Sequence, residues 1–233
     1  MNTIIIILGV VLILVIVFMI FRDFFEGKNK LSGEKHLADG VTRISGSDLS
    51  SPKSSNVTYS IWIYVQQWSS EGPGLIFSRD NDTHMILERN TARLKVHIGG
   101  TQTNGVVSNA LADIEVTNNF PIQKWVCVLV SVDNNITDVY LDGKLMKSIQ
   151  LNNPNSGAST ISPIDENINF GNWTGCYISK FERIPRSTDP KTAYDKYREG
   201  NGSSGLGNAL GNFNLKLAVT KDNVETSKFL LFG

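Results

Sequence analysis

The strongest constraint on this chain is an uninterrupted apolar stretch close to its N-terminus. Residues 4–21 contain no charged or strongly polar side chain, and all but Gly9 and Met19 are Ile, Leu, Val or Phe. As an α-helix this stretch extends about 27 Å, close to the roughly 30 Å hydrocarbon core of a bilayer. In lipid the backbone must satisfy its own hydrogen bonds, which favours a helix despite the many β-branched residues. We therefore predict a transmembrane anchor over residues 1–25, with residues 4–21 in the bilayer.

Two alternatives to a retained anchor are a cleaved secretory signal peptide and a buried helix of a soluble protein. A signal peptide has a basic start and a cleavage site made of small residues. The start here, Met1-Asn2-Thr3, has no basic side chain, and the Arg-Asp-Phe-Phe sequence at 22–25 is a poor cleavage site. Both features favour a retained anchor.

The flanking charges predict which side of the membrane the rest of the chain occupies. The C-terminal flank carries four basic residues, whereas the N-terminal flank has only the α-amine; the four are Arg22, Lys28, Lys30 and Lys35. By the positive-inside rule, this single-pass protein keeps its large soluble part on the cytosolic side. The Asn-x-Ser/Thr sequons do not argue otherwise, because a chain this rich in Asn, Ser and Thr contains several by chance.

The overall charge and the cysteine content exclude several classes of protein. Lys+Arg and Asp+Glu both number 22, so the chain has no net charge and lacks the basic footprint that nucleic-acid binding requires. The two cysteines, Cys127 and Cys176, are too few for a disulfide scaffold or a structural zinc site. The soluble part must therefore be held together by a hydrophobic core.

Short strand patterns separated by turn residues fill most of the chain after a polar, glycine-containing stalk at 26–40. Several runs alternate apolar and polar residues with period two, and others are wholly apolar. The predicted strands cover residues 57–65, 74–78, 84–88, 93–98, 125–132, 139–141, 144–146, 167–171 and 176–184. Strands at this spacing predict an all-β sandwich or jelly roll over residues 41–200.

Two local signals fix connections within this domain. Asp142-Gly143 lies between two strand patterns and favours a type I′ hairpin turn, because glycine adopts positive φ without steric cost. One short helix is predicted near the end of the domain, with Asp189 as its N-cap, Pro190 in its first turn and Gly200 beyond its last turn. Residues 201–233 are predicted to form a Gly/Ser/Asn linker and a C-terminal β-hairpin that pairs with the sandwich or with a neighbour.

The order of these motifs resembles a known family. The sequences TYSIWIYV, GLIFSRD, KWVCVLVSVDNNITDVYLDGKLMKSIQL, INFGN and CYISKFERIPRSTDPKTAYDKYREG resemble the laminin-G-like jelly roll of the concanavalin A-like lectin/glucanase superfamily. In that family a Trp opens a central strand, an Asp-Gly hairpin follows, and a Gly-Tyr-Ile strand comes next. Trp125, Asp142, Gly143, Tyr177 and Ile178 occupy those places. The strand after Tyr177 often carries acidic residues in the family, whereas Ser179 and Lys180 stand here, which argues against a metal-assisted site.

No catalytic, cofactor or metal site is predicted. Glycan hydrolysis needs two carboxylates about 5–9 Å apart, and the Glu-x-Asp-x-x-Glu spacing of the superfamily's endoglucanases is absent. Glu88, Glu115 and Glu182 lie singly on predicted strands, although pairs facing each other across strands stay open. The Asp80-Asn81-Asp82 and Asp133-Asn134-Asn135 stretches could offer oxygens to calcium, but such residues more often serve turns.

The histidines and cysteines show no functional spacing. His36, His84 and His97 lack the intervals of metal ligands. His84 and His97 lie on predicted strands, and we assign no functional role to the histidines. Cys127 and Cys176 lie on different predicted strands and could pair only if their Cα atoms lie within about 7 Å. Buried, reduced thiols are the preferred interpretation.

The tryptophans are the remaining candidates for ligand contact. Trp68 and Trp173 could stack on carbohydrate, as could Trp62, because indole faces pack against the apolar faces of sugars. Packing in the core or at its rim is the alternative for all three.

Two non-catalytic functions follow from these patterns. The first is a membrane-anchored structural protein, because an anchored jelly roll rich in Asn and Ile resembles virion proteins of large DNA viruses of algae and protists. That resemblance implies a minor capsid protein linking an internal membrane to the capsid shell, with other capsid proteins as partners. The second is a cell-surface lectin-like module that binds carbohydrate or protein, with Trp68 or Trp173 stacking on glycan.

Overall fold

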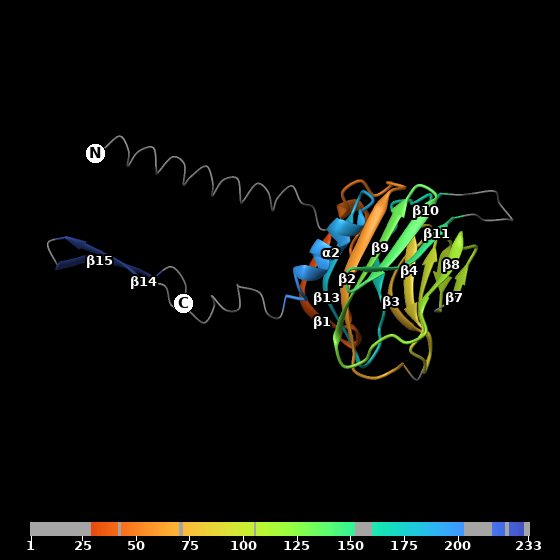
Figure 1. Ribbon diagram of the computed structural model, residues 1–233, viewed down its shortest axis with the longest axis horizontal. Helices are drawn as coiled ribbons and strands as arrows, with labels where there is room; N and C mark the ends of the chain where they lie inside the picture. The colour runs from red at the N-terminus through yellow and green to blue at the C-terminus, as the bar shows by residue number, and fades with distance from the viewer. Residues whose placement is uncertain are drawn as a thin grey trace.

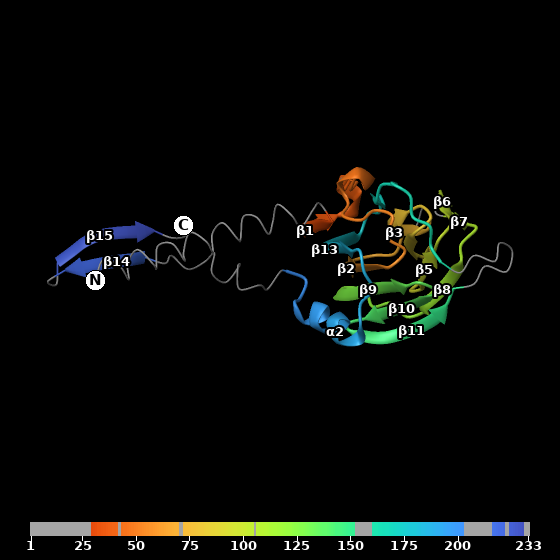
Figure 2. The same ribbon diagram turned by 90° about the horizontal axis from the view of Figure 1, so that it is seen from above.

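The soluble part of the chain forms a sandwich of two antiparallel sheets (Figures 1 and 2). The structure is a computed structural model that describes residues 29–41, 43–69, 72–104, 106–151 and 160–202, and the strands at 216–221 and 224–230. Within this part of the chain, no helix is long and apolar enough to cross a bilayer. The predicted anchor at 4–21 lies outside the described residues and stays a prediction.

The larger sheet has six strands in the order β1-β13-β2-β9-β10-β11. Its strands are β1 (Lys30–His36), β2 (Val57–Val65), β9 (Trp125–Asp133), β10 (Ile136–Leu141), β11 (Lys144–Gln150) and β13 (Cys176–Ile184). The smaller sheet has the order β12-β3-β4-β5-β8, with β3 (Gly74–Arg79), β4 (Thr83–Leu87), β5 (Leu94–Ile98), β8 (Ala112–Thr117) and β12 (Asn169–Phe170). The all-β sandwich expected from the sequence is thus confirmed.

Smaller elements complete the domain. A separate hairpin joins β6 (Thr101–Thr103) to β7 (Val106–Ser108), and short 3-10 helices occupy Leu37–Asp39 and Gly46–Asp48. The helix α2 (Pro190–Arg198) packs on the outer face of the six-stranded sheet (Figures 1 and 2). Beyond residue 202, β14 (Lys216–Lys221) and β15 (Val224–Leu230) form the predicted hairpin and pair with each other. Their docking on the sandwich or on a neighbour stays a prediction.

The hydrophobic core lies between the two sheets. Every second residue of β2, from Val57 to Val65, is buried there, and so are the alternate valines of β9. Three rings meet near its centre: Tyr59 and Phe77 lie 5.1 Å apart, and Phe77 and Phe181 lie 5.2 Å apart. Strand β2 is also largely buried on its opposite face, which explains why its sequence is partly apolar on both faces.

The structure confirms the predicted hairpin turn and the predicted start and end of the helix. Asp142 and Gly143 both have positive φ, 47° and 75°, as a type I′ turn between β10 and β11 requires. The Asp189 side chain accepts a hydrogen bond from the backbone N–H of Thr192 and caps α2. Gly200, at φ 68°, ends the helix in the left-handed conformation.

The first strand corrects the sequence-based division of the chain. The predicted stalk at 26–40 contains β1, which pairs with β13 along its length, so the sandwich begins at Lys30 and not at residue 41. The strand is polar because it lies at the sheet edge, where one flank faces solvent and charged residues discourage further pairing. A polar edge strand lacks the apolar alternation on which the prediction relied.

Candidate functional site

Loops at one end of the sandwich form a cleft that brings Trp68 and Trp173 together. Trp68 lies in the loop after β2, and Trp173 lies in the connection between β12 and β13. Both line a cleft of about 770 Å³. Polar side chains share the lining with the two indoles; they are Gln67, Ser69, Gln102, Asn104, Asn172 and Thr174. Mixed aromatic and polar walls of this kind suit a ligand with both apolar and hydroxyl-bearing surfaces.

Trp173 is fixed in the wall of this cleft. Its side chain is only 5% exposed, and its ring lies against Gly74, where an added Cβ would come within 2.8 Å of a ring carbon. The indole N–H of Trp173 is buried, and among the described residues it has no hydrogen-bond acceptor. A buried donor without a partner costs about 1–3 kcal/mol.

Trp68 is more exposed than Trp173. It packs against the edge of the hydrophobic core and stays partly exposed. The partly exposed indole of Trp68 can contact a ligand directly, whereas Trp173 is almost wholly buried. The structure therefore places both predicted residues at one cleft but exposes them to different extents.

The carboxylates considered for catalysis are engaged in ion pairs. Glu88 pairs with Lys95 and Arg93, and Arg93 also reaches Glu115. The hydrogen bond from Lys95 lowers the pKa of Glu88, despite an opposing contribution from burial. A glycosidase general acid needs the opposite shift, because it must stay protonated near neutral pH. Glu88 is therefore poorly suited to that role.

The Asp80-Asn81-Asp82 turn is used for internal structure. Asp82 is fully buried, forms an ion pair with Arg79 and accepts a 2.7 Å hydrogen bond from the hydroxyl of Tyr59. Burial, followed by the charge of Asp82, raises the pKa of Tyr59. Arg79 also donates to three backbone carbonyl groups, those of Pro52, Ile164 and Glu166. Within the described part of the chain, no three potential ligands cluster around a metal position.

Two of the three histidines are neighbours on adjacent strands, and the third lies elsewhere. His84 is buried and contacts the carbonyl oxygen of Gly100 at 3.2 Å, and its cross-strand neighbour His97 lies 3.5 Å from Asp113. Burial lowers the pKa of both imidazoles. His36 instead lies near the cleft, where its Nε2 accepts a hydrogen bond from the backbone N–H of Gly175.

The two cysteines are free thiols, as the sequence suggested, and both are buried. Cys127 lies on the outer face of β9, and burial together with Asp142 raises its pKa to about 12. Cys176 lies in the core, where burial raises its pKa as well. Neither thiol has the lowered pKa of a nucleophilic cysteine.

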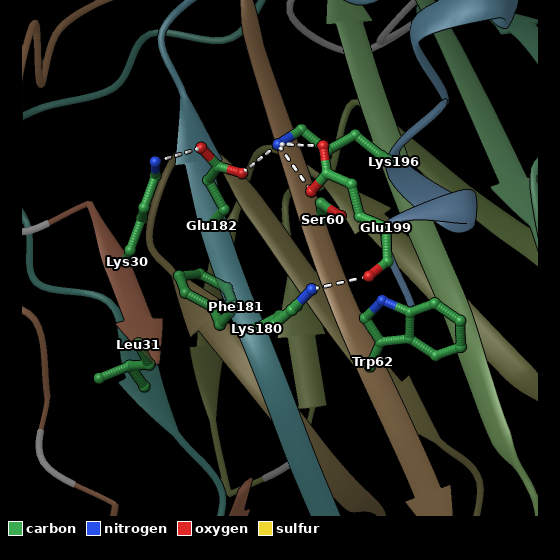
Figure 3. Close-up of a pocket in the computed structure, with 9 residues that line it drawn as sticks. All are labelled: Lys30, Leu31, Ser60, Trp62, Lys180, Phe181, Glu182, Lys196 and Glu199. Atoms are coloured by element: carbon green, nitrogen blue, oxygen red, sulfur yellow. Dashed lines mark hydrogen bonds and ion pairs between the residues drawn. The ribbon is translucent and has the colours of Figure 1, made fainter. Parts of the chain in front are cut away.

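A smaller hollow of about 210 Å³ lies beside α2 (Figure 3). Its charged groups pair with one another: Lys196 bridges Glu182 and Glu199, and the ammonium group of Lys180 donates to the backbone carbonyl of Glu199. Burial works to lower the pKa of Lys196, but the hydrogen bond and charge of Glu182 raise it overall. These contacts hold the helix on the sheet, so we assign this hollow a structural role.

An aromatic row, which the sequence did not reveal, crosses the outer face of the six-stranded sheet. It consists of four partly exposed residues in cross-strand register on adjacent strands: His36, Tyr177, Tyr64 and Trp125. Neighbouring ring centroids lie 4.5, 6.1 and 5.6 Å apart. Tyr64 and Trp125 each belong to a recognised strand, but aligning them requires the strand register, which a single sequence does not give.

Comparison with known proteins places this fold in a family. The model of the concanavalin A-like lectin/glucanases superfamily matches residues 38–175, more than half of the chain. The chain therefore belongs to this superfamily, which confirms the resemblance of its motifs. No curated protein sequence matches it.

Among solved structures, the fold is similar to receptor-binding domains of botulinum neurotoxins. The type G domain is 15% identical and has a TM-score of 0.45, with 62% of this chain and 38% of that chain covered. The binding domain of neurotoxin DC, solved in complex with SialylT, is 17% identical at a TM-score of 0.45, covering 62% of this chain and 35% of that one. This chain thus spans little more than a third of their length, and at these scores the likeness carries no functional argument.

Proposed function

We propose that this protein is a non-catalytic, membrane-anchored carbohydrate-binding module whose ligand occupies the cleft between Trp68 and Trp173. The observation that carries the proposal is the cleft itself, in which Trp68 and Trp173 share the lining with polar side chains. The polar side chains can hydrogen-bond with sugar hydroxyls, and the C–H groups of a sugar ring can pack on the exposed part of Trp68.

The position of the cleft on the sandwich supports this role. Asn29, the first described residue, hydrogen-bonds with Arg183 at one end of β13, whereas the cleft adjoins Cys176 at the other end of that strand. Seven residues of a strand extend roughly 20 Å, so the cleft lies well away from the entry of the predicted anchor. A ligand can therefore approach the cleft from the side opposite the attachment point.

A glycan array tests the proposal, using the full chain in a polyoxyethylene detergent, which carries no sugar of its own. We expect binding to a defined set of glycans that Trp68→Ala weakens at least about tenfold, because it removes the aromatic contact. Trp173→Phe keeps a smaller ring in the wall of the cleft, and we expect it to weaken binding less than Trp68→Ala does, by about threefold. Tyr194→Ala, on α2 and 50% exposed, is the matched control. Failure of the wild-type chain to bind any glycan contradicts the proposal.

A second candidate is the narrower assembly role, that of a minor capsid protein between an internal membrane and a capsid shell. One observation favours a protein contact of this kind. Strand β11 ends the six-stranded sheet, and it exposes Leu145 and Met146 by 51% and 42%. An open strand edge with exposed apolar side chains suits docking on a neighbouring chain.

The two roles differ in the side of the membrane that they require. A capsid contact needs the cytosolic side that the basic flank predicts, whereas a surface lectin needs the exterior. Protease protection of the intact membrane, together with proteomics of purified particles, separates them. Presence in particles with a protected domain supports assembly; digestion from the cell exterior supports the lectin.

A further inference from the structure

A second hollow, of about 280 Å³, lies on the outer face of the six-stranded sheet, around the aromatic row. It is lined by Glu34, Tyr64, Gln66, Trp125 and Tyr177. It is separate from the glycan cleft: Gln66 lines this hollow, whereas the next residue, Gln67, lines the cleft. The backbone N–H of Gln66 donates to the carbonyl oxygen of Gly175, which anchors the loop between the two sites.

Three aromatic rings wall the hollow at steep angles. The plane of Tyr64 makes an angle of 49° with the ring of Trp125 and 74° with the ring of Tyr177. Rings inclined to one another in this way form an uneven, open surface, on which a small group can contact more than one ring. His36 packs behind Tyr177 at 4.5 Å and accepts the hydrogen bond from Gly175, so Tyr177 is held from its far side.

The charge in this hollow differs from that in the hollow beside α2. There, lysines and glutamates pair with one another. Glu34, in contrast, forms no ion pair with any Lys, Arg or His among the described residues, and its side chain is exposed. A cation in this hollow is attracted both by the charge of the carboxylate and by the negative faces of the aromatic rings.

The hollow by itself is small compared with a protein interface. It is lined by five residues and has a volume of about 280 Å³. A stable protein interface uses about 20–30 residues on each partner. A small group that enters the hollow matches its size better.

We propose that this hollow binds a quaternary ammonium group of the choline type. A methylated ammonium has no N–H groups to satisfy, so it fits walls that offer ring faces and few acceptors. A primary ammonium would lose hydrogen bonds to water there, and a neutral sugar would make no use of the Glu34 charge. The proposal is independent of glycan binding in the cleft, because no residue lines both sites.

Calorimetric titration of the full chain tests the proposal, again in polyoxyethylene detergent, which carries no choline. The probes are choline and its uncharged analogue 3,3-dimethylbutan-1-ol, which has the same shape. We expect choline to bind with a dissociation constant on the order of 1 mM and the neutral analogue at least about tenfold more weakly. Equal binding of the two probes, or no binding of choline, overturns the proposal.

Variants separate recognition from folding. Glu34→Gln keeps the shape of the hollow and should weaken choline binding about tenfold, while the neutral analogue is unaffected. Trp125→Ala should weaken it by a similar factor, and Trp125→Phe should restore part of the affinity. Glu199→Gln, a carboxylate beside α2, is the matched control. Unchanged choline affinity in Glu34→Gln overturns the proposal.

Competition with lipid vesicles shows whether the ammonium group comes from a lipid headgroup or from a soluble compound. If a lipid headgroup reaches the hollow, phosphatidylcholine vesicles compete with choline and phosphatidylglycerol vesicles do not. If the natural ligand is a soluble choline-type compound, choline binds and neither vesicle competes. Both results support the proposed chemistry, whereas equal competition by both lipids contradicts it.

Discussion

The outer face of the six-stranded sheet has a covered half and an open half, although both are built on the same strands. In the covered half α2 packs over the sheet, so that Trp62 stacks on Tyr197 at 5.8 Å and Tyr140 is only 1% exposed. In the open half Tyr64, two residues beyond Trp62 on β2, stays partly exposed in the aromatic row. The same residue types therefore stabilise the domain at one end and are available to a ligand at the other.

The charges follow the same division. Beside α2 the ammonium and carboxylate groups satisfy one another, whereas Glu34 in the open half has no such partner in the described part of the chain. Satisfied charges serve structure, and an unpaired carboxylate near aromatic rings can serve recognition. This difference supports our proposal that the open half and the adjoining cleft form the binding end of the domain.

The largest predicted effect is a difference in stability between a variant in the covered half and a variant in the open half. Trp62→Ala should lower the free energy of unfolding by about 3–5 kcal/mol, because it leaves a cavity beneath α2. Trp125→Ala should lower it by about 1 kcal/mol or less, because its ring is partly exposed and supports no covering element. Urea unfolding followed by circular dichroism measures both. Similar losses for the two variants would remove the distinction between the halves.

A smaller effect is predicted for the contacts that hold α2 on the sheet. Lys196→Met should cost about 1 kcal/mol, since it removes partly buried ion pairs to Glu182 and Glu199. The folded-state pKa of Lys196 is raised, so its contribution is complete at neutral pH and is lost as the pH rises above 10.5, through the raised value. Lys191→Met, which removes an exposed pair with Asp195, should change nothing measurable. Equal effects of the two changes would show that Lys196 does not secure the helix.

The smallest predicted effect is a difference between the two thiols. Cys127 lies beneath the α2 side of the sheet with a pKa of about 12, so in the native protein it should react slowly with a disulfide reagent. Local opening of α2 should expose Cys127, whereas Cys176 in the core should react only on global unfolding. Cys127 should therefore be labelled faster than Cys176, in the wild-type protein and in Lys196→Met, as mass spectrometry of the labelled sites can show. Equal labelling rates of the two thiols would mean that α2 does not open separately.

Much of the fold follows from sequence patterns because the strongest signals are local. Alternating and apolar runs located β2, β9 and β13, and Asp142-Gly143 and Asp189 defined a turn and a helix start through backbone chemistry. Strand β1 escaped this reasoning, because an edge strand in contact with solvent needs no apolar face. Its absence from the predicted domain also hid His36 and Glu34.

The binding end was only partly predictable, because it depends on contacts between residues that are distant in sequence. Trp68 and Trp173 were recognisable as candidates, but their common cleft depends on how a loop after β2 meets the connection before β13. The aromatic row depends on register across four strands that are distant in sequence. The buried ion pair of Arg79 and Asp82 was likewise hidden, because those residues lie in and beside a turn whose composition indicates only the turn.

The central claim, that ligands bind at the open end and not beneath α2, can be tested directly with fluorine-labelled tryptophan. The chain has four tryptophans, and each should give one ¹⁹F NMR resonance. A bound glycan should shift the resonances of Trp68 and Trp173, and choline should shift that of Trp125, while the Trp62 resonance stays in place. Shifts confined to Trp62, or no shift of any resonance with either ligand, would contradict the account.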